Sequence, residues 1–180
     1  MPINHESVFK SFRDWLIQES GLSWDQSLKD WTFGIKDCFR KLAETFGYKA
    51  VLTSKDGKEY LVDIVWKRDN PDRYLSLAME TELSERKSAI LEDFEKLVDI
   101  KAFLKVGLFR LSSSAGTKTI VDEMKKILNK QFITFSETYL VIFLSFDNSS
   151  GKILIVAYDL DVKGITHHAV SEDSYKFPKS

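Results

Sequence analysis

The stretch Tyr60-Leu-Val-Asp63-Ile-Val-Trp-Lys67, followed after a polar break by Tyr74-Leu-Ser-Leu-Ala-Met-Glu80-Thr-Glu82, decides the fold of this chain. Both segments are apolar runs of the kind that form buried β-strands, and the turn residues Asn70-Pro71 separate them. Carboxylates are among the side chains least often buried unless a partner compensates their charge. Because Asp63, Glu80 and Glu82 lie inside these runs, the sequence raises the question of whether they converge on a divalent cation.

The composition is that of one globular domain. The chain has 180 residues, of which 43% are hydrophobic and 13% aromatic, and this is enough for a sizeable core. Without repeats or long linkers, we expect a single domain over residues 1–180, with a helical N-terminal region at 5–47 and a core over about 35–160. No apolar run reaches the roughly 20 residues of a membrane span, and no secretory signal is visible. A single cysteine, Cys38, excludes an intramolecular disulfide, so we expect a cytoplasmic protein.

The charge balance excludes few classes of function. The 26 basic and 27 acidic residues give a net charge of -1, which is no sign of a bulk polyanion binder. A nuclease remains compatible, because the carboxylates of its site and the basic groups around it cancel in the sum. One cysteine and three histidines argue against a structural zinc site, and the adjacent His167 and His168 would face opposite sides of a strand.

Hydrophobic periodicity predicts the order of the elements. A helix is expected at 5–19, and the capping-box pair Ser23 and Gln26 begins a second helical region that ends at Gly47. The remaining expectations are helices at 84–102 and 117–130, strands at 49–54, 60–67, 73–83, 103–111, 138–147 and 152–159, and a polar, partly ordered tail after Asp161.

These elements predict an α/β (α+β) fold. Residues 49–83 should form a three-stranded antiparallel meander, because short turns join the strands. Residues 73–111 should form a right-handed strand–helix–strand unit with parallel strands. The sheet is therefore expected to be mixed, with helices on both faces.

Register arithmetic brings two of the carboxylates together. Paired residues in a hairpin have numbers with a constant sum, which the turn at Asn70-Pro71 sets near 141 to 143, and Asp63 and Glu80 sum to 143. Directly paired residues have Cβ atoms about 5 Å apart. Glu82 points to the same face as Glu80. Carboxylates this close repel one another and raise at least one pKa, and Mg²⁺ removes the repulsion.

This pattern of elements and residues resembles the PD-(D/E)xK nuclease superfamily, which has the restriction-endonuclease-like fold. The resemblance covers roughly residues 35–111. Asp63 matches the aspartate of the motif, Glu80 matches the acidic residue of (D/E)xK, and Glu44 resembles the extra helix carboxylate of many members. The resemblance implies a Mg²⁺ or Mn²⁺ cofactor, with Asp63, Glu80, Glu82 and Glu44 as the candidate ligands.

The chain departs from the family pattern at two positions. Val62 stands where the motif often has proline, and Glu82 stands where it has lysine. Some members carry glutamate at that place and others move the lysine to the following helix, which makes Lys96 the first candidate for the moved lysine and Lys105 the second. In the implied chemistry Lys96 stabilises charge at the phosphate, and Glu82 acts as a further ligand or as a base.

The resemblance also implies a partner. The expected activity is phosphodiester hydrolysis in nucleic acid, with DNA favoured over RNA, no membrane partner, and a homodimer as one arrangement of the protein. Basic residues near the motif are the candidate phosphate contacts: Lys67, Arg68, Arg73, Arg86, Lys87 and Arg110.

Simpler interpretations stay open for these residues. Glu80 and Glu82 fit the solvated face of a half-exposed strand, and Lys96 fits an ordinary helix ion pair with Glu92. Glu44 fits a solvated helix position. Packing is favoured over base stacking for the tryptophans at 15, 24, 31 and 66, and burial is favoured over reactivity for Cys38.

Two further functions remain as alternatives to a nuclease. One is a catalytically inactive nuclease-fold protein that binds a protein or nucleic acid, which the glutamate at position 82 favours. The other is an unrelated α/β interaction module, such as an immunity or antitoxin protein.

Overall fold

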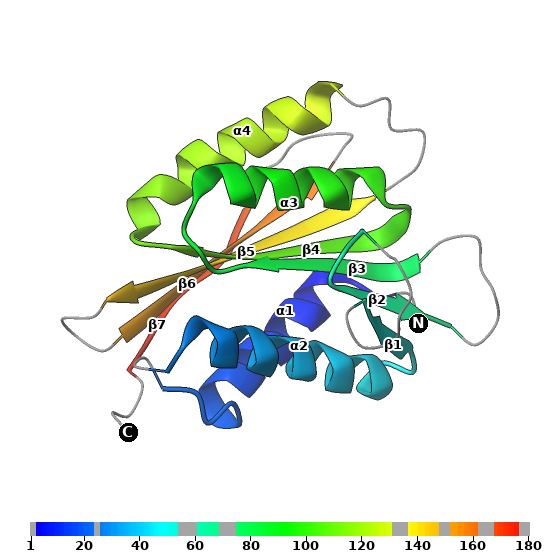
Figure 1. The fold of residues 1–180 in the computed structure, drawn as a ribbon, viewed down its shortest axis with the longest axis horizontal. Coiled ribbons are helices and arrows are strands. Elements are labelled where there is room, and N and C mark those ends of the chain that lie inside the picture. The colour runs from blue at the N-terminus through cyan, green and yellow to red at the C-terminus, as the bar shows by residue number, and fades with distance from the viewer. Residues whose placement is uncertain are drawn as a thin grey trace.

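A single mixed sheet organises the molecule. The computed structural model describes residues 3–23, 26–53, 61–68, 75–130, 137–147, 152–161 and 168–176. Over these residues seven strands form one sheet, and their order in space is their order in the chain. Helices cover both faces of this sheet (Figure 1). The expected α/β class, with a mixed sheet between helical layers, is confirmed.

The first half of the sheet has the predicted connectivity. Helices α1 (His5–Gln18) and α2 (Leu28–Thr45) precede an antiparallel meander of β1 (Lys49–Leu52), β2 (Ile64–Lys67) and β3 (Leu75–Glu82). Helix α3 (Lys87–Asp99) then leads to β4 (Ala102–Leu111), which pairs with β3 in parallel.

The second half extends the same sheet. After β4 come the short helix η1 (Ser114–Gly116), α4 (Thr117–Lys130), and β5 (Thr138–Asp147), which is parallel to β4. Strands β6 (Lys152–Asp161) and β7 (His168–Lys176) complete the sheet in antiparallel pairing.

The two faces of the sheet carry different helices. Two consecutive crossovers that advance in one direction, β3 to β4 and β4 to β5, place their helices on the same face because such connections are right-handed. Accordingly α3 and α4 pack on one face, and α1 and α2 pack on the other (Figure 1). The α1/α2 face has the larger core, with Trp31 and Trp66 fully buried in it.

Local sequence explains where the N-terminal helices begin and end. Asn4 caps α1 by accepting a hydrogen bond from Ser7 N (2.8 Å), and Ser27 caps α2 by accepting one from Asp30 N (3.2 Å). Such a cap is worth about 1 kcal/mol. Gly47 has a φ of 77°, which glycine adopts without steric cost, so it ends α2 as expected.

Several boundaries differ from the predictions. The strand expected at 60–67 begins at Ile64, and the helix expected at 84–102 spans Lys87–Asp99. The helix expected from Ser23 begins at Leu28, because Ser27 supplies the cap, although the Gln26 side chain still accepts a hydrogen bond from Ser23 N (3.2 Å). The polar tail contains β7, whose sequence does not alternate clearly. A long neighbour, β6, supplies the backbone partners that the strand needs.

Several core assignments are confirmed. Trp31 and Trp66 pack in the interior, and Cys38 is buried, so desolvation raises the pKa of its thiol. Trp24 lies outside the described residues. Within the described part of the chain, the helices include none that is long and apolar enough to cross a membrane.

Candidate functional site

The predicted register between β2 and β3 is confirmed. In this register Ile64 pairs with Met79, Val65 with Ala78 and Trp66 with Leu77, and the two residue numbers of each pair sum to 143. Asp63 directly precedes β2, and its backbone carbonyl accepts a hydrogen bond from Thr53 N at the end of β1 (3.2 Å). The meander therefore holds Asp63 across from Glu80, as the arithmetic required.

Two groups donate hydrogen bonds to the Asp63 carboxylate. Lys36 Nζ from α2 lies 2.6 Å from Oδ1, and the backbone N–H of Thr81 donates to Oδ2 over 3.0 Å. The carboxyl of Glu80 lies across the strand pair, close enough for the charge of Asp63 to raise its pKa.

Glu80 is the most perturbed acid of the site. It is only 4% exposed, although it lies in the strand face that the sequence also allowed to be solvated. Burial, together with the charges of Asp63 and Asp93, raises the pKa of Glu80 to about 8. The interpretation of Glu80 as a solvated residue is therefore wrong, because α3 covers this face of β3.

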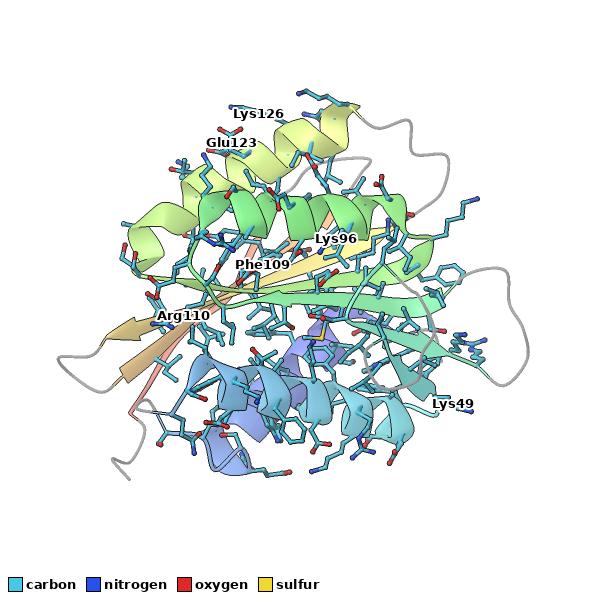
Figure 2. The ribbon with its side chains drawn as sticks, in the orientation of Figure 1. Lys49, Lys96, Phe109, Arg110, Glu123 and Lys126 are labelled. Carbon is cyan, nitrogen blue, oxygen red and sulfur yellow. The ribbon has the colours of Figure 1, made fainter. Side chains whose placement is uncertain are left out.

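Helix α3 contributes Asp93 and Lys96 to the surroundings of Glu80. Lys96 Nζ lies 2.6 Å from Asp93 Oδ1 and 3.8 Å from Glu80 Oε1. Figure 2 shows Lys96 below α3, on the side of the helix that faces the sheet. The hydrogen bond to Asp93 raises the pKa of Lys96, and burial raises the pKa of Asp93. Lys96 thus lies beside Glu80, and its partner on α3 is Asp93 rather than Glu92.

The other two candidate carboxylates have different surroundings. Glu82 is partly buried, and its Oε1 accepts a hydrogen bond from Ser84 N (2.7 Å) two residues further along the chain. Its charge helps to raise the pKa of Asp93, so it belongs to the rim of the site. Glu44 has a side chain that is 68% exposed and pairs with Arg40 (3.0 Å), and the structure does not bring it to Asp63.

Two residues of the cluster escaped the sequence analysis. Lys36 has no acidic residue three or four positions away on α2, so the sequence carries a weak sign that its partner lies elsewhere. Asp93 falls on the apolar stripe of α3 between Ile90 and Leu97, where a carboxylate requires compensation. Neither sign identifies its residue as part of the site until the structure shows which way each helix face points.

Lys105, the second candidate for the moved lysine, lies in another cluster. Its side chain is fully buried, and Nζ lies 2.5 Å from Glu137 Oε2, 3.1 Å from the Tyr139 hydroxyl and 3.0 Å from the carbonyl oxygen of Val98. Burial lowers the pKa of Lys105 despite these partners. The lysine therefore ties the end of α3 to β4 and β5, and its ammonium group is occupied there.

Most of the candidate phosphate contacts already have partners. Arg110 pairs with Glu85 (2.8 Å), and the Arg68 guanidinium lies over the Tyr48 ring. Lys87 lies 3.8 Å from Glu123 on α4. Arg73 lies outside the described residues.

The donor chemistry of the Asp63–Glu80 pair fits a hard divalent cation. Mg²⁺ prefers oxygen ligands and commonly binds through one or two carboxylates while keeping several waters. Thr81, between Glu80 and Glu82, also has a buried hydroxyl oxygen without a hydrogen-bond partner. Among the described residues no group of three or more His, Cys, Asp or Glu side chains is arranged to hold a metal ion. The fit therefore depends on the two carboxylates.

Comparison with known protein families, with curated proteins and with solved structures finds no match. The functional interpretation consequently depends on the chemistry of the site.

Proposed function

We propose that this protein is a metal-dependent, nuclease-like phosphodiesterase that hydrolyses nucleic acid with Mg²⁺ or Mn²⁺. The observation that carries the proposal is the cross-strand pair of the partly buried Asp63 and the buried Glu80, with Lys96 Nζ 3.8 Å from Glu80. Two acids held this close, one of them buried, are costly to maintain. A cation-binding role accounts for that cost, because a divalent ion would compensate both carboxylates.

The arrangement of elements around the pair supports the same proposal. Helix α2, the antiparallel strands β1 to β3, helix α3 and the parallel strand β4 follow one another in the order that the resemblance to PD-(D/E)xK nucleases implies. Asp63 directly precedes the second strand of this unit, and Glu80 is on the third. We therefore propose a restriction-endonuclease-like core for this part of the chain.

Each residue has a role in the proposed reaction. A bound metal ion would polarise the phosphoryl group and lower the pKa of a water molecule. Asp63 and Glu80 would hold the ion, and the protein would release the proton of Glu80 when it binds. Lys96 would stabilise negative charge near Glu80, and Asp93 fixes its position through the 2.6 Å ion pair.

A second function is favoured by the surroundings of Glu82. The family pattern places a lysine at that position, whereas Glu82 adds a negative charge and bonds to the nearby Ser84 N. An inactive nuclease-fold protein that binds a partner through the same surface would need no lysine there. Metal binding without hydrolysis would identify this alternative.

Metal binding is the first test. We expect Mn²⁺ or Mg²⁺ to raise the melting temperature of the wild-type protein, and Asp63→Asn to abolish that increase because an amide is a poor ligand for a hard cation. Asp37→Asn is the matched control, since Asp37 pairs with Arg40 and Lys41 on α2 rather than with the site. A wild-type protein that shows no metal-dependent shift would contradict the proposal.

Hydrolysis is the second test. Single-stranded and double-stranded DNA and RNA are incubated with the metal-loaded protein, and the products are separated by size. Cleavage that disappears in Asp63→Asn and persists in Asp37→Asn supports the nuclease. Metal binding with no cleavage of any of the four substrates favours the binding protein instead.

A further inference from the structure

Among the described residues, Lys36 is the one cation that forms an ion pair with the site from the α1/α2 layer. It is located on α2, and its Nζ lies 2.6 Å from Asp63 Oδ1 with both side chains less than a quarter exposed. Asp63 is its one ion-pair partner among the described residues. The neighbouring charges of α2 pair with one another instead, Asp37 with Arg40 and Lys41, and Arg40 with Glu44.

Lys96, unlike Lys36, has two carboxylate partners. It reaches Glu80 from the opposite layer, but its shorter ion pair is with Asp93, at 2.6 Å against 3.8 Å for Glu80. When Glu80 acquires another partner, Lys96 therefore keeps a carboxylate on its own helix. When Asp63 acquires another partner, Lys36 keeps no ion-pair partner in the part of the chain that the structure describes.

The charges of the site change when a divalent cation binds. Without metal, the Asp63 carboxylate and the Lys36 ammonium group form an ion pair and neutralise each other. With metal, the two carboxylates neutralise the ion, so nothing attracts Lys36 to Asp63. The ion and the ammonium group would also compete for Asp63 Oδ1 and repel each other. The long lysine side chain can then turn outward while it remains near the metal.

From this difference we infer that Lys36 is the counter-ion of Asp63 that the metal displaces, and that the displaced ammonium group binds the phosphate of the substrate. The inference rests on the proposed function and adds to it the residue that couples metal binding to substrate binding. Lys36, from α2, then supplies the free positive charge that the chain lacks at position 82. Lys96 remains paired with Asp93 throughout.

The affinity for Mn²⁺ alone tests the first half of the inference. Lys36→Met removes the competing cation, so we expect calorimetry to show Mn²⁺ binding about fivefold tighter than in the wild type. This is the size of change expected when the metal no longer has to break one partly exposed ion pair. Lys36→Arg keeps the charge and should leave the affinity near the wild-type value. Lys41→Met is the matched control, because Lys41 pairs with Asp37 on the same helix.

Binding of a short DNA duplex tests the second half of the inference, and the duplex is added to Mn²⁺-loaded proteins that differ only at Lys36 or Lys41. The probe is a phosphorothioate duplex that resists hydrolysis. We expect Lys36→Met to weaken duplex binding several-fold while Lys41→Met does not, since Lys41 keeps its partner Asp37 when metal binds. Tighter Mn²⁺ binding with unchanged duplex binding would overturn the phosphate-binding role.

The outcomes distinguish a failure of this inference from a failure of the proposed function. Unchanged or weaker Mn²⁺ binding in Lys36→Met overturns the inference and leaves the proposed function intact, provided that the wild type binds Mn²⁺. Absence of Mn²⁺ binding in the wild type overturns both. If Lys36→Met does not fold, ¹⁵N NMR of the lysine ammonium groups in the wild-type protein replaces it. A Lys36 signal that does not change when Mg²⁺ saturates the protein overturns the inference.

Discussion

At the scale of single residues, Glu80 has the environment that departs most from an ordinary one. Its carboxyl is almost inaccessible to water, and Asp63 and Asp93 add negative charge around it. Each of these factors disfavours the ionised form, so the pKa of Glu80 rises to about 8. At neutral pH the metal-free protein therefore keeps a proton on Glu80, and ionisation of this group opposes folding.

This pKa predicts how the stability of the metal-free protein changes with pH. The folded-state pKa lies above the value of about 4.5 for an unperturbed glutamate, so the folded state binds the proton more tightly than the unfolded state between these values. The free energy of unfolding should therefore fall as pH rises from about 5 to about 8, by up to about 1.4 kcal/mol per pH unit from this group.

Glu80→Gln isolates the contribution of Glu80. The amide does not ionise, so in urea denaturation with a chelator present the variant should lose this pH dependence and exceed the wild type in stability near pH 9. Glu82→Gln is the control, because Glu82 is partly exposed and bonds to Ser84 N. Identical pH profiles for wild type and Glu80→Gln would contradict the protonated state of Glu80.

Lys105 gives a prediction about stability that is independent of the site. Lys105→Met leaves Glu137 buried without its counter-ion, and breaking a buried pair in this way costs about 3–5 kcal/mol. The melting temperature should fall by roughly 10 °C. The double variant Lys105→Met with Glu137→Met removes both charges and should regain most of the loss. A double variant as unstable as the single one would show that Lys105 acts mainly through Tyr139 and Val98.

At the scale of elements, β3 shows what a strand pattern can and cannot predict. Alternation correctly put Glu80 and Ala78 on one face and Leu77 and Met79 on the other. It could not show that α3 covers the face of Glu80, because alternation is also typical of strands with one solvated face. The burial of Glu80 comes from the parallel crossover through α3, which is a property of the connection and not of the strand.

Strand β4 carries a glycine that packing requires. Gly107 is the register partner of Glu80, and a Cβ atom added there would lie 2.5 Å from the Phe109 ring. Gly107→Ala must therefore displace Phe109 and should destabilise the protein by about 1–3 kcal/mol in urea denaturation. Gly116→Ala is the matched control, since a Cβ there has no neighbour within 4 Å. Equal stability of the two variants would mean that the Phe109 ring moves without cost.

At the scale of the whole molecule, the sequence predicted what depends on local pattern and chain order. The meander, the parallel unit around α3 and the pairing of Asp63 with Glu80 follow from periodicity, turn position and the handedness of crossovers. Lys36 could not be found in this way, because α2 and β2 are joined only by tertiary packing. Strand β7 was missed for a related reason, since its partner β6 stabilises a segment with little pattern of its own.

The two faces of the sheet permit a test of whether the chain unfolds as one unit. All four tryptophans, at positions 15, 24, 31 and 66, precede β3, and Trp31 and Trp66 belong to the α1/α2 core. Their fluorescence therefore reports that layer, whereas far-UV circular dichroism reports both. Phe39 lies in the α1/α2 core and Phe94 in the α3/α4 core, and replacing either with alanine should cost about 3–5 kcal/mol.

Because both cores pack on one sheet, we expect a single cooperative transition in which the two signals coincide for every variant. Phe94→Ala, although it is remote from the tryptophans of the α1/α2 core, should move the fluorescence midpoint as far as it moves the dichroism midpoint. Phe103→Ala is the control, since its ring is 47% exposed and its loss should change stability by no more than about 0.5 kcal/mol. A fluorescence transition that stays at its wild-type midpoint in Phe94→Ala would mean that the α3/α4 layer, with Asp93 and Lys96, unfolds on its own. The metal site would then lie between two units of different stability, and metal binding would be needed to join them.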